Sequence, residues 1–396
     1  MNQLNFKTHF LAGPWVGLMF ISATLVAQTG CKKHSSRLTD ELENQTTFRI
    51  GEVGSMTGSE ATFGISTHNG ISLAITEINA EGGVKGKSFE LFTVDDQSKP
   101  EEAATAVTQL INQNRVNAIL GEVASSRSLA MAPIAQGGKI PMITPSSTNP
   151  AVTEMGDYIF RVCFIDPFQG EVMAKFSLNN LKIRKVAILR DIKSDYSTGL
   201  ARYFTAAFKK GGGEITLQQS YEAGDIDFKS QLTAIRTAKP QAILVPGYYT
   251  EVGLIARQAR ELGLTIPLLG GDGWDSPKLG EIAGKALDNS YFSNHYSSEN
   301  QAPNIQNFIS KYKSKFGAIP DGMAAMGYDA AKVLADAAKR AKSASAADLR
   351  DALAATRDYH GVTGTITIDQ QRNAVKSAVV LKVENGAFKY QTTVNP

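Results

Sequence analysis

The chain has little cysteine: two residues among 396, Cys31 near the N-terminus and Cys163 in the body. A single thiol in the body excludes a disulfide there, and also a metal site built from paired cysteines. A chain of this length does not need such a cross-link, because it can bury at least one large core and most simply two. We therefore expect Cys163 to be a small buried apolar residue.

The chain also has little excess charge, with 41 lysines and arginines against 38 aspartates and glutamates. No stretch shows a basic stripe interleaved with aromatic residues, the pattern typical of proteins that bind DNA or RNA. We therefore expect no nucleic-acid partner.

Recognisable catalytic motifs are missing as well. There is no His-Glu-x-x-His and no Gly-x-Ser-x-Gly, and Gly51, Gly54 and Gly58 do not have the spacing of a dinucleotide-binding loop. The five histidines are scattered, and we interpret His295 as a structural residue rather than a base. The sequence favours a protein that is not an enzyme and that holds no metal or cofactor.

One glycine-rich stretch, NAEGGVKGKSFELF at residues 79–92, contains the GKS of a phosphate-binding loop. Such a loop needs a further glycine at the position where Glu81 stands. The elements are also in the wrong order, because helical spacing precedes the loop and a strand pattern follows it. We interpret the stretch as a glycine turn between a helix and a strand.

The N-terminus contains the apolar run FLAGPWVGLMFISATLVA after Lys7, followed by the polar segment KKHSSRLTDELENQ. This is the plan of an export signal, which we place at residues 1–30. The polar segment has no periodicity, and we interpret residues 31–46 as a flexible tether. The sequence therefore predicts an exported protein.

The end of the signal, Gly30-Cys31, resembles the cleavage site of bacterial lipoproteins, and the resemblance implies lipidation at Cys31. The sequence departs from that family at Gln28, where a leucine is usual. Cleavage by the ordinary signal peptidase and an uncleaved anchor are the alternatives, although Pro14 within a short apolar run argues against a stable spanning helix.

From Phe48 onward, short apolar runs alternate with helical patterns, which predicts parallel strands joined by crossover helices. The predicted strands are FRIGEV, FELFTV, NAILGEV and IPMIT, with helices from about 66, from about 101 and near 127–136. After FRVCF the pattern restarts with KVAILRD, EITLQQS, QAILVPG and IPLLGGD, with helices near 197–210, 227–237 and 250–262. The fold class is therefore α/β, with two doubly wound parallel sheets.

Beyond residue 290 the pattern changes. Helices near 304–316, 322–341 and 346–356 lead to GTITID and to SAVVLKVENGAFKY, a hairpin signalled by Glu-Asn-Gly. Because these elements make no complete third unit, we expect them to pack onto the first two.

Doubly wound sheets bind ligands at the loops that follow their strands. In the first unit these loops carry Ser125, Ser146 and Thr148, which suit a carboxylate through hydroxyls and helix N-terminal amides. In the second they carry Asp272, placed to pair with a cation, and three aromatic residues that wall the space or face the cation, namely Tyr196, Tyr248 and Trp274. Together they favour a zwitterion held between two domains; the alternative for each is a helix cap or a packing role.

From about residue 47 to 382 the chain resembles the periplasmic substrate-binding proteins of branched-chain amino-acid ABC transporters, of the leucine/isoleucine/valine-binding type. The motifs that carry the resemblance are GEVGSMTG, INAEGGVKGKSFEL, VDDQSKP, GEVASS, IPMITPSST, FRVCFID, DYSTGLA and the helix containing Gly327-Tyr328-Asp329-Ala330. It implies the type I periplasmic binding protein fold, two lobes joined by a hinge that the chain crosses three times. The lobes would comprise residues 47–165 with 296–370, and residues 166–295 with 371–396.

The resemblance also implies a role for individual residues. Ser125, Ser146 and Thr148 would hold the ligand's α-carboxylate, and Tyr248 and Asp272 would complete the ammonium site, with Asp272 where the branched-chain binder has Glu. Side-chain contacts would come from three further positions, Phe63, Ala124 and Tyr196. Trp274 departs from the family pattern, and a ring there would shrink the pocket or stack on an aromatic ligand.

The function so implied is that of an extracytoplasmic receptor, a monomer that captures an amino acid and delivers it to the permease of an ABC importer. It would act in the periplasm or at the outer face of the cell membrane, lipid-anchored. The alternatives are a receptor for an amide, urea or an aromatic acid, and a ligand sensor of the same fold.

Overall fold

The computed structural model describes residues 46–396, so the predicted signal, most of the tether and Cys31 lie outside the described residues. Its first sheet is wholly parallel, in the strand order β2-β1-β3-β4-β5. These strands are β1 (Phe48–Gly54), β2 (Phe89–Asp95), β3 (Ala118–Leu120), β4 (Met142–Thr144) and β5 (Ile159–Arg161). The order is that of a doubly wound sheet with its switch point between β1 and β3.

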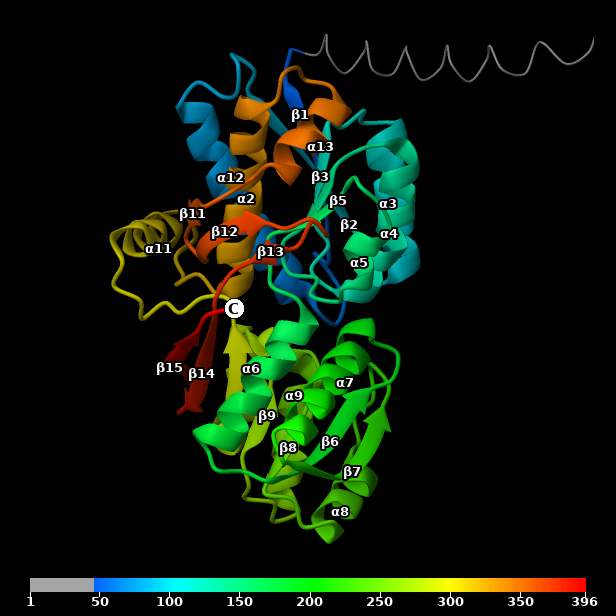
Figure 1. Ribbon diagram of the computed structural model, residues 1–396, viewed down its shortest axis with the longest axis vertical. Coiled ribbons are helices and arrows are strands. Elements are labelled where there is room, and N and C mark those ends of the chain that lie inside the picture. The colour runs from blue at the N-terminus through cyan, green and yellow to red at the C-terminus, as the bar shows by residue number, and fades with distance from the viewer. Residues whose placement is uncertain (1–45) are drawn as a thin grey trace, which may run out of the picture. The chain divides into compact units, whose positions relative to one another are not determined.

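Helices cover both faces of this sheet (Figure 1). α3 packs on α4 on one face, and α2 packs on α12 on the other. The helices of this part are α2 (Ala61–Ala80), α3 (Pro100–Asn112), α4 (Ser125–Gly138), α5 (Ala151–Glu154), α11 (Pro303–Phe316), α12 (Gly322–Arg340) and α13 (Ala346–Ala354).

The second sheet repeats the same order, β7-β6-β8-β9-β10, and adds the antiparallel pair β14 and β15 beside β10. Its strands are β6 (Lys185–Asp191), β7 (Glu214–Tyr221), β8 (Ala242–Leu244), β9 (Leu268–Gly270), β10 (Tyr291–Asn294), β14 (Ala378–Glu384) and β15 (Ala387–Val394). Its helices are α6 (Asp166–Asn179), α7 (Asp195–Lys210), α8 (Lys229–Thr237), α9 (Tyr249–Glu261), η1 (Asp272–Trp274), α10 (Pro277–Ala283) and η2 (Gly284–Leu287). The predicted α/β class with two doubly wound sheets is confirmed.

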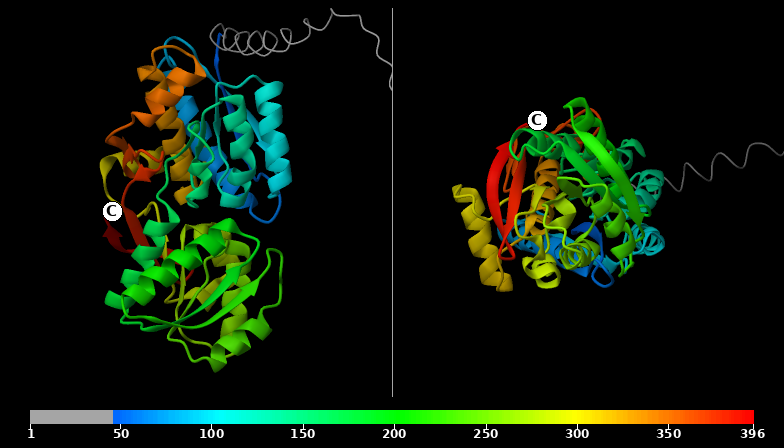
Figure 2. Two further views of the ribbon diagram at one scale, coloured as in Figure 1. Left: turned by 45° about the vertical axis from the view of Figure 1, so that its right-hand side comes forward. Right: turned by 90° about the horizontal axis from the view of Figure 1, so that it is seen from below.

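We call the part built on the first sheet the first lobe and the part built on the second sheet the second lobe. The chain passes between them three times: between β5 and α6, between β10 and α11, and between β13 (Ala374–Val375) and β14. β13 belongs to a small antiparallel sheet with β11 (Tyr359–Gly361) and β12 (Gly364–Ile368). Figure 2 shows these passages from two further sides.

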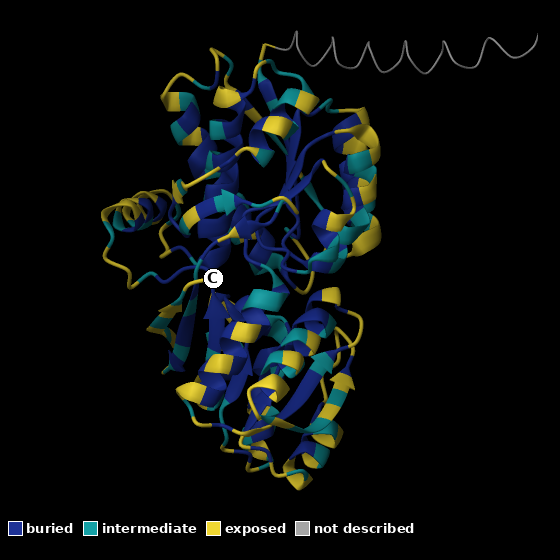
Figure 3. Ribbon diagram, in the orientation of Figure 1, coloured by how far each residue is buried: buried dark blue, intermediate teal, exposed yellow. Residues whose placement is uncertain are grey.

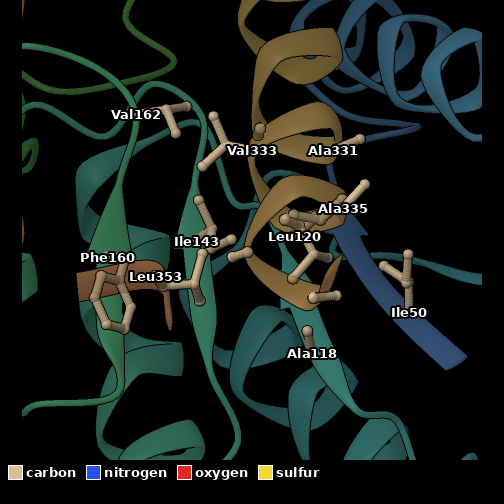
Figure 4. Close-up of a cluster of buried hydrophobic side chains, with 14 of the residues drawn as sticks. Ile50, Ala118, Leu120, Ile143, Phe160, Val162, Ala331, Val333, Ala335 and Leu353 are labelled. Atoms are coloured by element: carbon tan, nitrogen blue, oxygen red, sulfur yellow. The ribbon is translucent and has the colours of Figure 1, made fainter. Parts of the chain in front are cut away.

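The first core lies where the first sheet meets α2 and α12 (Figure 4). Ile50, Leu120 and Ile143 are buried against Ala331 and Val333 of α12, so the late helix completes a core begun 280 residues earlier. In Figure 3 the central strands are dark, while exposed residues lie on the outer faces of the helices and in the connecting loops. This is the pattern expected of strands covered on both faces.

The glycine stretch at 79–92 is a turn, as predicted. α2 ends at Ala80, the Val84 amide donates to the Lys87 carbonyl at 2.9 Å, and β2 starts at Phe89. Gly82, Gly83 and Gly86 all have positive φ, which favours glycine. The predicted hairpin at Glu-Asn-Gly is also confirmed, between β14 and β15.

One predicted helix starts earlier than expected, and one helix was not predicted. The helix expected from about 66 begins at Ala61, because Gly64 lets the first turn lie directly against the backbone of Ser55. The helix that was not predicted is α6, whose buried residues include the polar side chains Asp166, Gln169 and Ser177, so its apolar residues alone do not mark a helical period. Cys163 is fully buried in the first core, as expected, and burial raises the pKa of its thiol to about 12.

Candidate functional site

The loops that follow the parallel strands of both lobes meet around one small cavity. The cavity is small, with about 200 Å³ of space free of protein atoms when the space open to solvent is included. Its walls are Phe63, Val123, Ser125, Ser146, Tyr196, Tyr248, Asp272, Gly273 and Met323. Six of the nine predicted ligand residues line it, namely Phe63, Ser125, Ser146, Tyr196, Tyr248 and Asp272.

The first lobe brings hydroxyls to the cavity. Ser125 is the first residue of α4, and its Oγ accepts from the amide of Asn149 at 3.2 Å. The hydroxyl of Ser146 is buried and has no hydrogen-bond partner among the described residues. Because a buried hydroxyl without a partner is costly, the Ser146 Oγ is available to a polar group that enters the cavity.

The loop that carries Ser146 is held in place by contacts on the side away from the cavity. Ser147 turns away from the cavity, and its Oγ lies 2.7 Å from that of Ser128 and 2.9 Å from the carbonyl of Val123. Arg161, fully buried at the end of β5, donates to the carbonyls of Ser147 and Asn149. These contacts fix the backbone from which Ser146 and Thr148 project.

Thr148 does not line the cavity. Its carbonyl accepts from the Asp166 amide at 2.9 Å, at the first passage between the lobes. Burial raises the pKa of Asp166 to about 8, and the nearby Thr148 hydroxyl acts in the opposite direction. Thr148 is therefore next to the site, facing a buried carboxyl group that sequence reasoning did not identify.

The second lobe brings a carboxylate and two rings. Asp272, the first residue of η1, is buried, and it faces the cavity from the end of β9. Gln169 Nε2 lies 2.6 Å from its Oδ1, and His295 Nε2 lies 3.1 Å from its Oδ2. The carboxylate is therefore fixed by two side chains from distant segments, one from α6 and one from the end of β10.

Aromatic side chains form the remaining wall. The rings of Tyr196 and Tyr248 are stacked, with centroids 5.3 Å apart, and the Tyr196 hydroxyl accepts from the Gly273 amide at 3.2 Å. Phe63 meets Tyr248 edge to face at 5.7 Å. With Met323 beside them, these groups give the cavity one apolar side opposite its polar one.

Trp274 and Ala124 do not line the cavity. The Trp274 ring is fully buried in the core of the second lobe, where it contacts Phe292 and its Nε1 donates to the Val245 carbonyl at 3.0 Å. The placement does not support a contact between this ring and a ligand. Ala124 precedes α4 with its amide turned to the Glu122 carboxylate, and Val123 faces the cavity in its place.

Hydrogen bonds join the two lobes at the rim of the cavity. The Thr62 hydroxyl lies 2.8 Å from that of Ser276, and the Thr250 hydroxyl donates to the Ser59 carbonyl at 2.9 Å. Farther along, Asn149 Nδ2 donates to the Asp195 carbonyl at 2.8 Å. The lobes are therefore in direct contact around the site.

A buried ionic cluster supports the first-lobe side of the cavity. Arg127 of α4 lies 2.5 Å from Glu60, 3.0 Å from Glu122 and 3.6 Å from Asp96. Burial, with Glu122 adding to it, raises the pKa of Asp96 to about 7, and burial also raises the pKa of Glu60. One guanidinium thus ties the loop after β1 and the loop after β3 to the start of α4.

Sequence reasoning missed the partners of Asp272. Gln169 lies on α6, the helix without a visible period, and His295 was interpreted as a structural residue. His295 does follow the strand YFSN directly, so the rule that points to loops after parallel strands would have found it. None of the described helices is both long and apolar enough to cross a membrane.

Comparison with known proteins gives a consistent result. A family model described as periplasmic binding protein matches residues 47–387. A leucine binding protein, LivK, from Thermotoga maritima has a solved structure with 41% sequence identity and a TM-score of 0.85, covering 88% of this chain and 99% of that one. The branched-chain amino-acid transporter substrate binding protein LivJ from Streptococcus pneumoniae, solved in complex with isoleucine, has 35% identity and a TM-score of 0.84, covering 88% and 100%.

Among curated proteins, the Leu/Ile/Val-binding protein homolog 3 of Brucella melitensis biotype 1 is 32% identical over 246 residues, or 62% of this chain. The match spans 66% of that relative's length.

Proposed function

The chain belongs to the periplasmic binding protein family, in its branched-chain amino-acid type, and from this we propose that it is an extracytoplasmic receptor that captures an amino acid between its lobes. The observation that carries the proposal is the placement of Asp272 opposite Ser125 and Ser146 across one small cavity. A carboxylate on one side suits an ammonium group, and two hydroxyls on the other side, that of Ser125 at a helix start, suit a carboxylate group. An α-amino acid carries both groups on one carbon.

The apolar side of the cavity defines the side chain of the ligand. Phe63, Val123 and Met323 with the stacked tyrosines offer no charged group to a ligand side chain, which favours a branched-chain or related hydrophobic amino acid. Asp272 is one methylene shorter than the Glu that the family has at this position, so its charge lies farther back. Asp in place of Glu is compatible with an amino-acid ligand, but it does not identify leucine as that ligand.

Capture works by closure of the lobes. The first lobe supplies Ser125 and Ser146, and the second lobe supplies Asp272, so only the closed state satisfies both charged ends of the ligand. A ligand shifts the equilibrium toward the state for which it has the higher affinity, here the closed one. Closed, loaded protein then delivers the amino acid to a membrane permease of an ABC importer. The receptor itself carries no catalytic role.

The proposal also includes the location of the protein in the cell. Export through residues 1–30 and lipidation at Cys31 would hold a monomeric receptor in the periplasm or at the outer face of the membrane, with residues 31–46 as its tether. These features rest on the sequence pattern.

The runner-up is a receptor for an aromatic acid, favoured by the Tyr196–Tyr248 stack and the Phe63 edge. An acid without an amine leaves the Asp272 carboxylate facing an uncharged group or a like charge, a costly arrangement in a buried site. The carboxylate therefore favours the amino acid. An amide, urea or a sensing role is tested by the same panel of ligands and by the presence of a partner permease.

The test is thermal unfolding of residues 32–396, refolded from denaturant to remove bound ligand, with amino acids, amides, urea and aromatic acids. A ligand at a hundred times its Kd adds about 2.7 kcal/mol of stability, which raises the melting temperature measurably. We expect a shift with hydrophobic amino acids only. A shift with an amine-free acid or amide, and with no amino acid, would contradict the proposal.

The role of Asp272 is tested in the same assay. Asp272→Ala leaves a buried ammonium without its partner, and the loss is about 3 to 5 kcal/mol, more than a hundredfold in Kd. The matched control is Asp225→Asn, an exposed carboxylate of the same lobe outside the cavity, which should bind as the parent does. Equal affinity of parent and Asp272→Ala would show that the site is assigned wrongly.

A further inference from the structure

Asp272 presents only part of its hydrogen-bonding capacity to the cavity. An ionised carboxylate offers about four lone-pair positions. Gln169 occupies one on Oδ1 at 2.6 Å, and His295 occupies one on Oδ2 at 3.1 Å. One position on each oxygen is left for a ligand, and the direction of these two positions is set by Gln169 and His295.

His295 lies at the hinge. It follows β10 directly, where the chain passes from the second lobe to the first, and its ring stacks on Phe164 of the first passage with centroids 3.8 Å apart. Gln169 is in the first turn of α6, just after that passage. The carboxylate at the cavity is thereby connected to two of the three passages between the lobes.

The tautomer of His295 follows from its contacts. Burial lowers the pKa of the imidazole, while Asp272 acts in the opposite direction, so the neutral ring predominates near pH 7. A neutral ring has one N–H, and the carboxylate accepts it from Nε2. Nδ1 is then a bare acceptor, and it has no hydrogen-bond partner among the described residues, while the ring itself is stacked on Phe164.

We propose that His295 is a positioning residue for Asp272 and that its protonation competes with binding of the ligand's ammonium group. The inference rests on the proposed function. Neutral His295 donates one hydrogen bond to Asp272, and the negative charge of Asp272 remains available to pair with the ligand. Protonated His295 forms an ion pair with Asp272 on the side away from the cavity. The ammonium group of the ligand would then bind beside a cation instead of pairing with a free carboxylate. At a pH where His295 is protonated, binding of an amino acid therefore expels that proton, and acid weakens binding of the ligand.

Other charged groups surround the ring. Lys376, at the third passage, faces His295, and burial lowers the pKa of Lys376 to about 8. Asp166 and Cys163 face Asp272 from the first passage, and burial keeps both protonated near neutral pH. Asp275 also faces Asp272, and burial raises the pKa of Asp275 to about 7. Its titration is common to the parent and to the His295 variants, so the contribution of His295 is the difference between their pH profiles.

The test compares two substitutions at one position. His295→Gln keeps an N–H donor near the place of Nε2 but cannot become a cation, whereas His295→Leu removes the donor. The probes are L-leucine and 4-methylpentanoate, its counterpart without the amine, or the equivalent pair for whichever amino acid binds the parent best. Affinities are measured by calorimetry at pH 5, 6, 7 and 7.5.

For the parent we expect the affinity for the amino acid to fall toward low pH, approaching about tenfold per pH unit below the pKa of His295 because one proton is exchanged. Between pH 7.5 and pH 5 the affinity of His295→Gln should fall less than that of the parent, because its side chain binds no proton. His295→Leu should bind the amino acid more weakly at every pH, with the amine-free acid unaffected. A merely structural role would change both probes alike.

Titration of the ring by NMR, without ligand, gives an independent readout. Asp272→Asn removes the charge that favours the imidazolium, so the pKa of His295 should fall in that variant. An unchanged pKa, or the same pH profile of binding in the parent and His295→Gln, would overturn the inference while amino-acid binding itself stands. If the parent binds no amino acid at pH 7.5, the proposed function fails and the inference fails with it.

Discussion

Arg161 and Asn149 are joined by a hydrogen bond of 2.8 Å from the guanidinium to the backbone carbonyl, and the same guanidinium also reaches the carbonyl of Ser147. The loop with Ser146 and Thr148 is therefore held by a charged group that never faces the cavity. Burial lowers the pKa of Arg161, yet the side chain remains cationic at neutral pH. The first ligand-facing loop thus depends on a residue at the end of β5.

Replacing Arg161 should make the protein less stable. Arg161→Met keeps the bulk of the side chain and leaves buried carbonyls without donors, so the free energy of unfolding should fall by about 2 to 4 kcal/mol. Urea unfolding measures the change. The control is Arg350→Met, which removes partly exposed ion pairs with Asp157 and Asp351 and a cation–π contact with Tyr158, and should cost about 0 to 1 kcal/mol. Similar losses in the two variants would contradict the role given to Arg161.

The rim contact between the lobes predicts a kinetic effect. Thr62→Val removes the hydroxyl that lies 2.8 Å from Ser276, and loss of one such bond destabilises the closed state by about 1 kcal/mol, or about fivefold in Kd. The loss should be visible as faster ligand dissociation in stopped-flow measurements. Thr105→Val on α3, whose hydroxyl bonds only within its own helix, is the matched control. Unchanged dissociation in Thr62→Val would mean that this contact does not hold the lobes together.

The fold was predictable where hydrophobic runs are strong. KVAILRD was expected as a strand, and β6 is Lys185–Asp191, because a strand covered on both faces must be apolar along its length. α6 was not predicted because its buried residues include the polar side chains Asp166, Gln169 and Ser177, which interrupt the apolar pattern on which helical periodicity depends. Burial therefore reveals a strand that is apolar along its length and conceals a helix that buries polar groups.

The site was predictable to the level of loops but not of side-chain directions. Loops after parallel strands identified Ser125 and Asp272, which line the cavity, and also Trp274, which turns into the core two residues later. The contact between Asp272 and Gln169 joins positions 103 residues apart, and no local pattern encodes it. Which member of a loop faces a ligand is decided by tertiary packing.

The packing of α2 on α12 predicts a site where one methyl group is not tolerated. A Cβ at Gly70 would overlap the carbonyl oxygen of Ala324, which is backbone and cannot move without displacing α12. Gly70→Ala should therefore destabilise the protein by about 2 to 3 kcal/mol. Gly137→Ala is the matched control, because a Cβ at this position of α4 meets nothing within 4 Å and glycine is unfavourable within a helix. It should leave stability unchanged or raise it by up to about 1 kcal/mol. Thermal unfolding of the two variants checks the contrast.

The buried carboxyl group of Asp166 makes stability depend on pH. Burial raises its pKa to about 8 in the folded protein, whereas in the unfolded chain the group titrates near its ordinary value of 3.8. Between these two pH values the folded state holds a proton that the unfolded state has released, so its contribution to stability is complete below pH 3.8 and is lost as the pH rises toward about 8. Asp166→Asn keeps a neutral side chain at every pH. Relative to the parent, this variant should therefore gain stability as the pH rises from about 4 to 8, by up to about 1.4 kcal/mol per pH unit, and gain nothing further above that range.

Urea unfolding of the parent and Asp166→Asn at pH 5, 7 and 9 measures this difference, and Asp195→Asn, an exposed carboxylate at the start of α7, controls for removal of a charge alone. A difference between parent and Asp166→Asn that stays constant from pH 5 to 9 would mean that Asp166 is ionised in the folded protein. In that case the hydrogen-bonded junction of Thr148 and Asp166 would hold a charge beside the ligand site, and the affinity for an amino acid should then depend on Asp166 as well as on Asp272. Binding measured with Asp166→Asn at pH 7 decides this: a neutral Asp166 predicts an affinity close to that of the parent.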